Sequence, residues 1–245
     1  PVVGGASTGK SAFITAYASS VISKIAPSKG LTTRFYDGER EQMYNSMSDA
    51  YRDGVVEKTV TATAQNASSA FSFSFFVDGP SLKPSRMMQL LDIAGETFVD
   101  NNENERQSQY AHCEGIVLVI DPLAIPQVSA LCANSLNSSD RGSISDARLE
   151  DVMSALQNDL RETADVDRSG RIRTPLAVVM NKVDASPILD RSIGDSAVRQ
   201  LQSADHEAFG NALDATDYLC RQFLVDADMG DVVDIIGQQF VTSRF

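Results

Sequence analysis

The chain has 245 residues, of which 42% are hydrophobic and 22% charged, and its net charge is −12 at pH 7. This length and composition allow one α/β domain whose core needs neither disulfides nor a structural metal. The acidic balance disfavours nucleic acid and anionic membranes as partners, because both would repel the surface. The sequence has no signal peptide and no apolar run of about 20 residues, so we expect no membrane contact from it.

The cysteines are far apart and form no C-x-x-C pair; they are Cys113, Cys132 and Cys220. This pattern suits a reducing compartment and argues against zinc, so we expect a cytoplasmic protein. The chain begins without Met, in what reads as the middle of a core strand, and ends directly after a predicted strand. We therefore expect it to be part of a longer protein.

The first element is an apolar stub at residues 2–3, followed by a glycine-rich loop. Residues 4–11 read G-G-A-S-T-G-K-S and fill the Walker A pattern, and helical spacing continues to residue 26. In such a loop, backbone N–H groups hold phosphates, Lys10 reaches the outer phosphates and Ser11 offers an oxygen to Mg²⁺. The loop predicts binding of a nucleoside triphosphate. The expected contacts come from Gly4, Ala6, Ser7, Thr8, Gly9, Lys10, Ser11 and Ala12.

An insertion and a hairpin come next. Residues 27–58 read as an insertion that contains a helix from Glu39 to about Arg52. Residues 71–75 alternate Phe and Ser, and a D-G-P turn follows, which predicts a strand antiparallel to residues 87–91. The phenylalanines could also stack on bases, but the acidic chain has no interleaved Lys or Arg there, so we favour a role in the core.

The second motif is D-x-x-G, formed by Asp92 and Gly95 after the apolar strand at 87–91. A carboxylate here can hold Mg²⁺ through water, and the Gly95 N–H can touch a γ-phosphate, whose loss would release the following segment. The tetrapeptide alone also fits an ordinary strand-to-turn junction. With a Walker A loop upstream, we favour the switch. The polar residues 100–107 suit a switch segment and equally any surface loop.

The rest of the chain alternates strands and helices. Residues 115–120 and 176–180 are near-continuous apolar runs, typical of parallel strands covered on both faces. Residues 122–145 are rich in Ser, Asn and Pro, the composition of an exposed loop, and apolar stripes at 149–160 and 209–223 predict helices. This order predicts a mostly parallel sheet with one antiparallel edge strand.

The third motif, N-K-V-D, follows the strand at 176–180. The Asp184 carboxylate can accept two hydrogen bonds from guanine, where adenine offers no such pair. Lys182 can lay its stem along the base, and Asn181 can tie this loop to the phosphate loop. The motif alone is weak, but it lies at the sheet edge where α/β proteins bind ligands. Near the end, residues 240–243 read as a short strand whose Ser243 N–H could contact the guanine oxygen.

These motifs occur in the order found in the Ras-like P-loop GTPases of the translation-factor-related class, which the chain resembles over nearly its whole length. The long segment before the switch threonine, and D-x-A-G-E in place of D-T-A-G-Q, resemble the bacterial double-GTPase group. The resemblance implies a three-layer P-loop NTPase fold and one GTPase domain at 1–245, with insertions at 27–58 and 122–145. It also implies Mg²⁺-dependent binding of GTP, hydrolysis to GDP and phosphate, and a protein effector or activating protein as partner.

Some family positions remain open or differ. The switch threonine that binds Mg²⁺ beside Ser11 and Asp92 is Thr59, Thr61 or Thr63, and we favour Thr59 because it ends the inserted segment. Glu96 replaces the water-positioning glutamine; it can accept a proton but cannot donate an amide hydrogen, so we expect hydrolysis without a partner to be slow. The expected catalytic residues are Lys10, Thr59 and Glu96.

Arg52 could act as an arginine finger in cis, but we favour a solvated helix arginine. The sequence leaves two other functions open. One is a GTP-bound scaffold that does not hydrolyse. The other is a P-loop ATPase, which N-K-V-D disfavours.

Overall fold

The computed structural model describes residues 1–53, 72–93, 110 and 112–245. The chain divides into two compact units. The first comprises Pro1–Val2 and Lys10–Ala94, and the second comprises Val3–Gly9 and Gly95–Phe245. Five predicted switch or catalytic residues lie outside the described part: Thr59, Thr61, Thr63, Gly95 and Glu96.

The first unit begins with a long helical segment. Helix α1 (Lys10–Ser20) runs through a π-helical turn (Val21–Ile25) into α2 (Ala26–Ser28). Strand β2 (Thr32–Phe35) and helix α3 (Gly38–Arg52) follow, so the predicted helix is present within the insertion. The Asp37 carboxylate caps α3 by accepting a hydrogen bond from the Arg40 backbone N–H over 2.8 Å.

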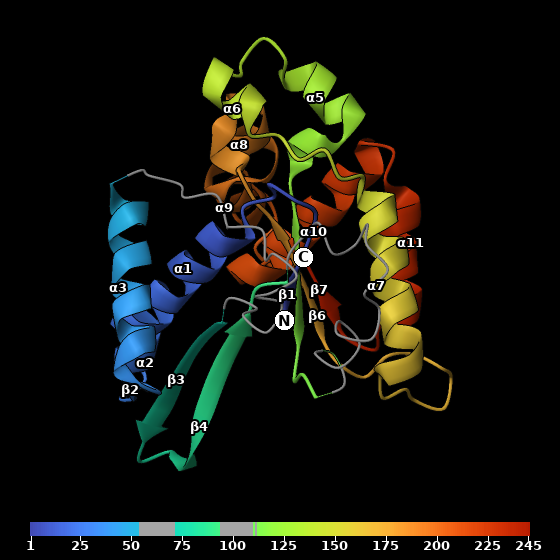
Figure 1. The fold of residues 1–245 in the computed structure, drawn as a ribbon. Coiled ribbons are helices and arrows are strands. Elements are labelled where there is room, and N and C mark those ends of the chain that lie inside the picture. Colours follow the sequence, from blue (N-terminus) through green and yellow to red (C-terminus); the bar gives the residue numbers. More distant parts are fainter. Residues whose placement is uncertain (54–71, 94–109, 111) are drawn as a thin grey trace, which may run out of the picture. The chain divides into compact units, whose positions relative to one another are not determined.

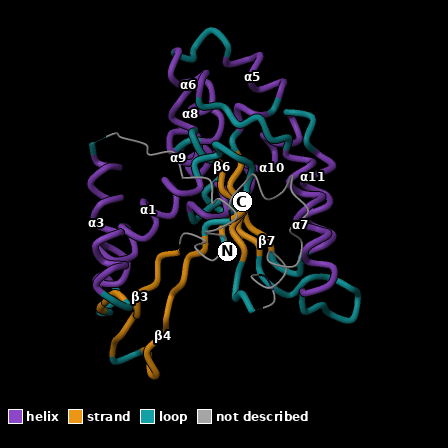
Figure 2. The backbone as a smooth tube through the Cα atoms, viewed as in Figure 1, coloured by secondary structure: helices purple, strands orange, loops and turns teal. Residues whose placement is uncertain are grey.

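An antiparallel sheet completes this unit (Figure 1). The predicted hairpin is formed by β3 (Ser72–Gly79) and β4 (Leu82–Leu91), the two long strands in Figure 2. Strand β2 pairs with the other edge of β3, so the antiparallel part has three strands, in the order β2-β3-β4, instead of the predicted one. Phe73 and Phe75 are fully buried, which confirms their role in the core.

The second unit contains the parallel strands. Strand β5 (Ile116–Ile120) pairs in parallel with β6 (Leu176–Met180) along its whole length, and β6 pairs with β7 (Ser243–Arg244). With β1 (Val2–Val3), the sheet has the order β1-β5-β6-β7. The sequence predicted β5 and β6 to within one residue, because both strands are almost entirely apolar.

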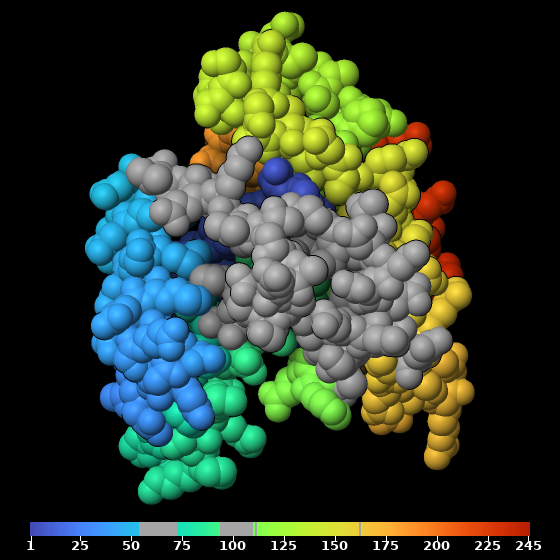
Figure 3. All heavy atoms as spheres, in the orientation of Figure 1, coloured from blue at the N-terminus to red at the C-terminus, as the bar shows by residue number. Residues whose placement is uncertain are grey.

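The segment at 122–145 differs from the prediction of an exposed loop. It contains a 3-10 helix (Pro122–Ala124) and the helices α5 (Pro126–Cys132) and α6 (Ser138–Gly142). Its prolines start two of these helices, a position that proline favours. Several apolar side chains are buried among the polar ones: Leu123, Ile125, Val128 and Cys132. In Figure 3 this segment, coloured yellow-green, forms the upper end of the second unit.

In the described part of this unit, five further α-helices follow the insertion. They are α7 (Leu149–Thr163), α8 (Pro187–Ile193), α9 (Asp195–Ala204), α10 (Ala212–Asp226) and α11 (Gly230–Gln239). The predicted apolar stripe of α7 is buried in the core. In Figure 1, α7 and α11 lie on one side of the parallel strands.

Among the described residues, no helix has the length and apolarity needed to cross a bilayer.

Candidate functional site

The glycine-rich loop leads from β1 toward α1, as the Walker A motif requires. Gly4 and Gly9 have φ angles of +153° and +85°, which residues with a Cβ rarely adopt. A Cβ on Gly4 would collide with the Val119 carbonyl oxygen, and a Cβ on Gly9 would collide with the Asn181 side-chain amide. Both glycines are therefore required by close approach as well as by backbone conformation.

Two residues of N-K-V-D contact this loop. The Asn181 side-chain amide donates a hydrogen bond to the Thr8 carbonyl oxygen over 2.8 Å, which is the tie that the sequence predicts. The Lys182 ammonium donates to the Ser7 carbonyl oxygen over 2.6 Å. Asp184 is exposed in the short 3-10 helix that follows (Val183–Ala185). The N-K-V-D motif and the glycine-rich loop, in which we predicted the base and phosphate contacts, are thus joined directly by hydrogen bonds.

Asp121 belongs to this network although it is part of none of the predicted motifs. Its carboxylate is fully buried and lies 2.8 Å from the Lys182 ammonium. It also accepts hydrogen bonds from the backbone N–H groups of Leu123 and Ser145 over 3.0 and 3.1 Å. A signal was present, because Asp121 directly follows the apolar run of β5, as Asp92 directly follows β4.

The segment that ends the insertion also contacts the phosphate loop. The Ser145 hydroxyl donates to the Ala6 carbonyl oxygen over 2.5 Å, and the Ser143 carbonyl oxygen accepts from the Lys182 ammonium. A Cβ on Gly5 would collide with that of Ala147. We call residues 143–147 the return segment, because here the chain leaves the insertion, lies against the glycine-rich loop and leads into α7 (Leu149–Thr163).

In the first unit, Ser11 and Asp92 come together. The Ser11 hydroxyl donates to the Asp92 carboxylate over 2.5 Å. Asp92 is held by a parallel bridge to Val2, and the Ile93 N–H donates to the Val2 carbonyl oxygen over 3.1 Å. A hydroxyl beside a buried carboxylate offers the oxygen ligands that Mg²⁺ prefers, so these residues fit the ion. Lys10, the first residue of α1, is buried.

The structure does not bring Ser243 to the base-reading residues. In the parallel register, Ser243 lies opposite Leu176, the first residue of β6, whereas Asn181 follows the last. The five residue steps from Leu176 to Asn181 span roughly 16 Å at about 3.3 Å per residue. Instead, the Arg221 guanidinium donates to the carbonyl and hydroxyl oxygens of Ser243. This placement does not support the predicted contact of Ser243 with guanine, because the residue types alone did not fix the register of this two-residue strand.

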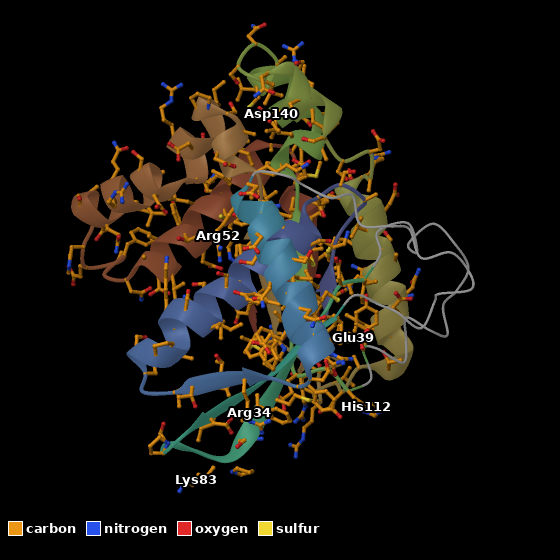
Figure 4. The ribbon with its side chains drawn as sticks, turned by 60° about the vertical axis from the view of Figure 1, so that its left-hand side comes forward. Arg34, Glu39, Arg52, Lys83, His112 and Asp140 are labelled. Atoms are coloured by element: carbon orange, nitrogen blue, oxygen red, sulfur yellow. The ribbon has the colours of Figure 1, made fainter. Side chains whose placement is uncertain are left out.

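Arg52 is engaged on its own helix. Its guanidinium lies 3.0 Å from the Asp49 carboxylate and donates to the Ser48 hydroxyl over 3.3 Å, and 71% of the side chain is exposed. Figure 4 shows Arg52 near one end of α3 and Glu39 near the other. These contacts agree with a solvated helix arginine, which the sequence analysis favoured.

A model of the Double-GTPase 2 family matches residues 1–234. No curated protein and no solved structure matches the chain. The matched range includes the Walker A loop, Asp92 and N-K-V-D, and it stops before Ser243. Because the match spans nearly all of the 245 residues, the chain belongs to the Double-GTPase 2 family.

Proposed function

We propose that this chain is a guanine-nucleotide switch that binds GTP with Mg²⁺ and hydrolyses it to GDP and phosphate. The observation that carries the proposal is the hydrogen bond from Asn181 to Thr8. A nucleotide is held at its base and its phosphates at once, so a direct bond between the loops that read them supports one shared ligand. Membership of the Double-GTPase 2 family supports the same activity. We further propose that residues 1–245 serve as one GTPase domain in the cytoplasm.

The phosphate contacts belong to the Walker A loop. Backbone N–H groups of the loop and the Lys10 ammonium hold the phosphates. Ser11, Asp92 and a switch threonine, for which we favour Thr59, hold Mg²⁺. When bound, the ion would offset the negative charge of the phosphates. The other residues that we expect to contact the phosphates in this region are Gly4, Ala6, Ser7, Thr8, Gly9 and Ala12.

The base contacts belong to N-K-V-D. The exposed Asp184 carboxylate accepts hydrogen bonds from the N1–H and the exocyclic amine of guanine. Lys182 lays its carbon stem along the base, while its ammonium stays bound to the Ser7 carbonyl oxygen. Adenine lacks the two donors and would leave the carboxylate unpaired, so GTP is preferred over ATP.

Hydrolysis follows in-line attack of water on the γ-phosphate. Glu96 orients the water, Lys10 and the switch threonine stabilise the transferring group, and Gly95 senses the γ-phosphate. A glutamate cannot donate an amide hydrogen to the transition state, so unaided turnover is slow, and an activating protein or effector is the expected partner.

A scaffold that binds GTP without hydrolysing it is the second candidate. Glu96 favours it, and so does Arg52, whose guanidinium is engaged by Asp49 and Ser48. Single-turnover release of phosphate from GTP with Mg²⁺ separates the two functions, with Lys10→Ala as the inactive control. Release that depends on Lys10 supports the switch. No release, even with added cell extract, supports the scaffold, and a preference for ATP would overturn both.

A further inference from the structure

The Asp121 carboxylate belongs to none of the motifs above, yet it contacts Lys182 of N-K-V-D directly and reaches the phosphate loop through Ser145. We propose that Asp121 is a positioning residue for guanine nucleotide, because it fixes the ammonium of Lys182 between the phosphate loop and the return segment. The inference rests on the proposed function, since it concerns the same site. Asp121 is then a further residue of that site, and the return segment helps to hold the phosphate loop.

The Lys182 ammonium has three acceptors from three separate parts of the second unit. They are the Ser7 carbonyl oxygen in the phosphate loop, the Asp121 carboxylate after β5 and the Ser143 carbonyl oxygen in the return segment. A lysine ammonium has three N–H donors, so this arrangement uses all of them. Of the three acceptors, only Asp121 carries a negative charge, and it is the one that compensates the cation.

Burial makes this pair sensitive to the loss of either partner. The Asp121 side chain is 0% exposed and that of Lys182 is 19% exposed. A charge left without its partner in such surroundings is strongly unfavourable. Without the carboxylate, the ammonium would turn toward water, and the four-carbon stem of Lys182 would leave its position. The stem is the part of Lys182 that packs on the base in the proposed function, so its order is a condition of tight binding.

Asp121 supports the phosphate loop by a second route. Its carboxylate accepts from the Ser145 backbone N–H, and the Ser145 hydroxyl donates to the Ala6 carbonyl oxygen. The return segment is thereby fixed to the phosphate loop on one side and to Asp121 on the other. A change at Asp121 should therefore weaken the hold on both the base and the phosphates.

The test is a double-mutant cycle on the affinity for GDP that carries a fluorescent label. Lys182→Met keeps the length of the stem and removes the ammonium. Asp121→Asn should weaken GDP binding by about tenfold or more in the wild-type background, and by several-fold less in Lys182→Met, where only the contact with Ser145 is left to lose. Asp167→Asn is the matched control: this half-buried carboxylate also accepts backbone N–H groups, from Ser169 and Arg171, in the loop before β6. Its effect should stay below about twofold.

A comparison with Asp121→Glu separates positioning from packing. The glutamate keeps the charge that compensates Lys182, so it should retain more GDP affinity than the neutral Asp121→Asn. If Asp121 served only to fill its buried site, the order would reverse, because a longer side chain disturbs packing more than an isosteric amide. Thermal unfolding without nucleotide checks that each variant folds. If Asp121→Asn does not fold, the cycle is run with Asp121→Glu, and the coupling to Lys182 again decides.

The outcomes separate this inference from the proposed function. Coupling between Asp121 and Lys182, with the stronger loss in Asp121→Asn, supports it. A wild-type protein that binds GDP, together with an Asp121→Asn variant that binds equally well or loses as much in both backgrounds, overturns the inference alone. A wild-type protein that binds no guanine nucleotide overturns the proposed function and the inference with it.

Discussion

The side-chain amide of Asn181 donates a hydrogen bond to the backbone carbonyl oxygen of Thr8 over 2.8 Å, although 173 positions separate the two residues in the chain. The bond leaves no room for a side chain at Gly9, whose Cβ would overlap the same amide. The position of the N-K-V-D loop thus depends on a glycine in the phosphate loop.

Gly9→Ala should therefore weaken binding of both GTP and GDP. The φ angle of +85° costs a residue with a Cβ about 1–2 kcal/mol, and displacement of Asn181 adds to this cost. We expect affinity to fall by about tenfold or more, since 1.4 kcal/mol corresponds to a factor of ten. Gly142→Ala is the control, because a Cβ there meets no atom within 4 Å. Equal affinities of the two variants would contradict the prediction.

Asp184→Asn should change the preferred base. In the proposed site, the carboxylate accepts two hydrogen bonds from guanine, one from the N1–H and one from the exocyclic amine. The amide of an asparagine can accept from the N1–H of xanthine and donate to the xanthine carbonyl oxygen that replaces the amine. We expect GTP affinity to fall by about 100-fold and XTP affinity to rise, measured by titration against both. Asp195→Asn, an exposed change at the start of α9, should leave both affinities unaltered. Unchanged discrimination in Asp184→Asn would remove the base assignment.

Ser11→Ala should reduce the effect of Mg²⁺. The Ser11 hydroxyl, 2.5 Å from the Asp92 carboxylate, is the proposed direct ligand. In the wild type, Mg²⁺ should tighten GTP binding, and removal of the ion with a chelator should reverse this. We expect the gain to shrink by about tenfold in the variant. Ser23→Ala removes a hydroxyl that donates to the Ser19 carbonyl oxygen of its own helical segment, so this control should respond to Mg²⁺ as the wild type does.

Cys220 should make the folded protein less stable in alkali. Burial, with a smaller contribution from the Asp217 carboxylate, raises the pKa of the thiol from 9.0 to about 11. Between these values the unfolded chain releases the proton while the folded chain keeps it, so the free energy of unfolding falls as pH rises. The loss reaches about 2 kcal/mol at pH 11 and becomes negligible below about pH 8.

Denaturant unfolding at pH 8 to 11 measures this loss. Other groups also titrate in this range, so Cys220→Ala is the reference: its decline should be shallower than that of the wild type. Parallel declines of the two proteins would show that the thiol does not contribute.

Local patterns in the sequence predicted the elements that carry the site. The near-continuous apolar residues of β5 and β6 are typical of parallel strands covered on both faces, and the alternation of Phe73 and Phe75 with serines defines one buried face of a hairpin. Local composition failed at residues 122–145, because a few buried apolar residues there are spaced among polar ones that suggested a loop.

The sequence by itself determined the Walker A loop, the position of Asp92 after β4 and the N-K-V-D motif, because each depends on residue types at short, fixed spacing. Only the tertiary structure decided which distant groups meet. It added β2 to the edge of β3, brought Asp121 and the return segment to Lys182, and set Ser243 at the opposite end of β6 from Asn181. Such contacts depend on the register of strands and the path of the connections between them, which local spacing does not specify.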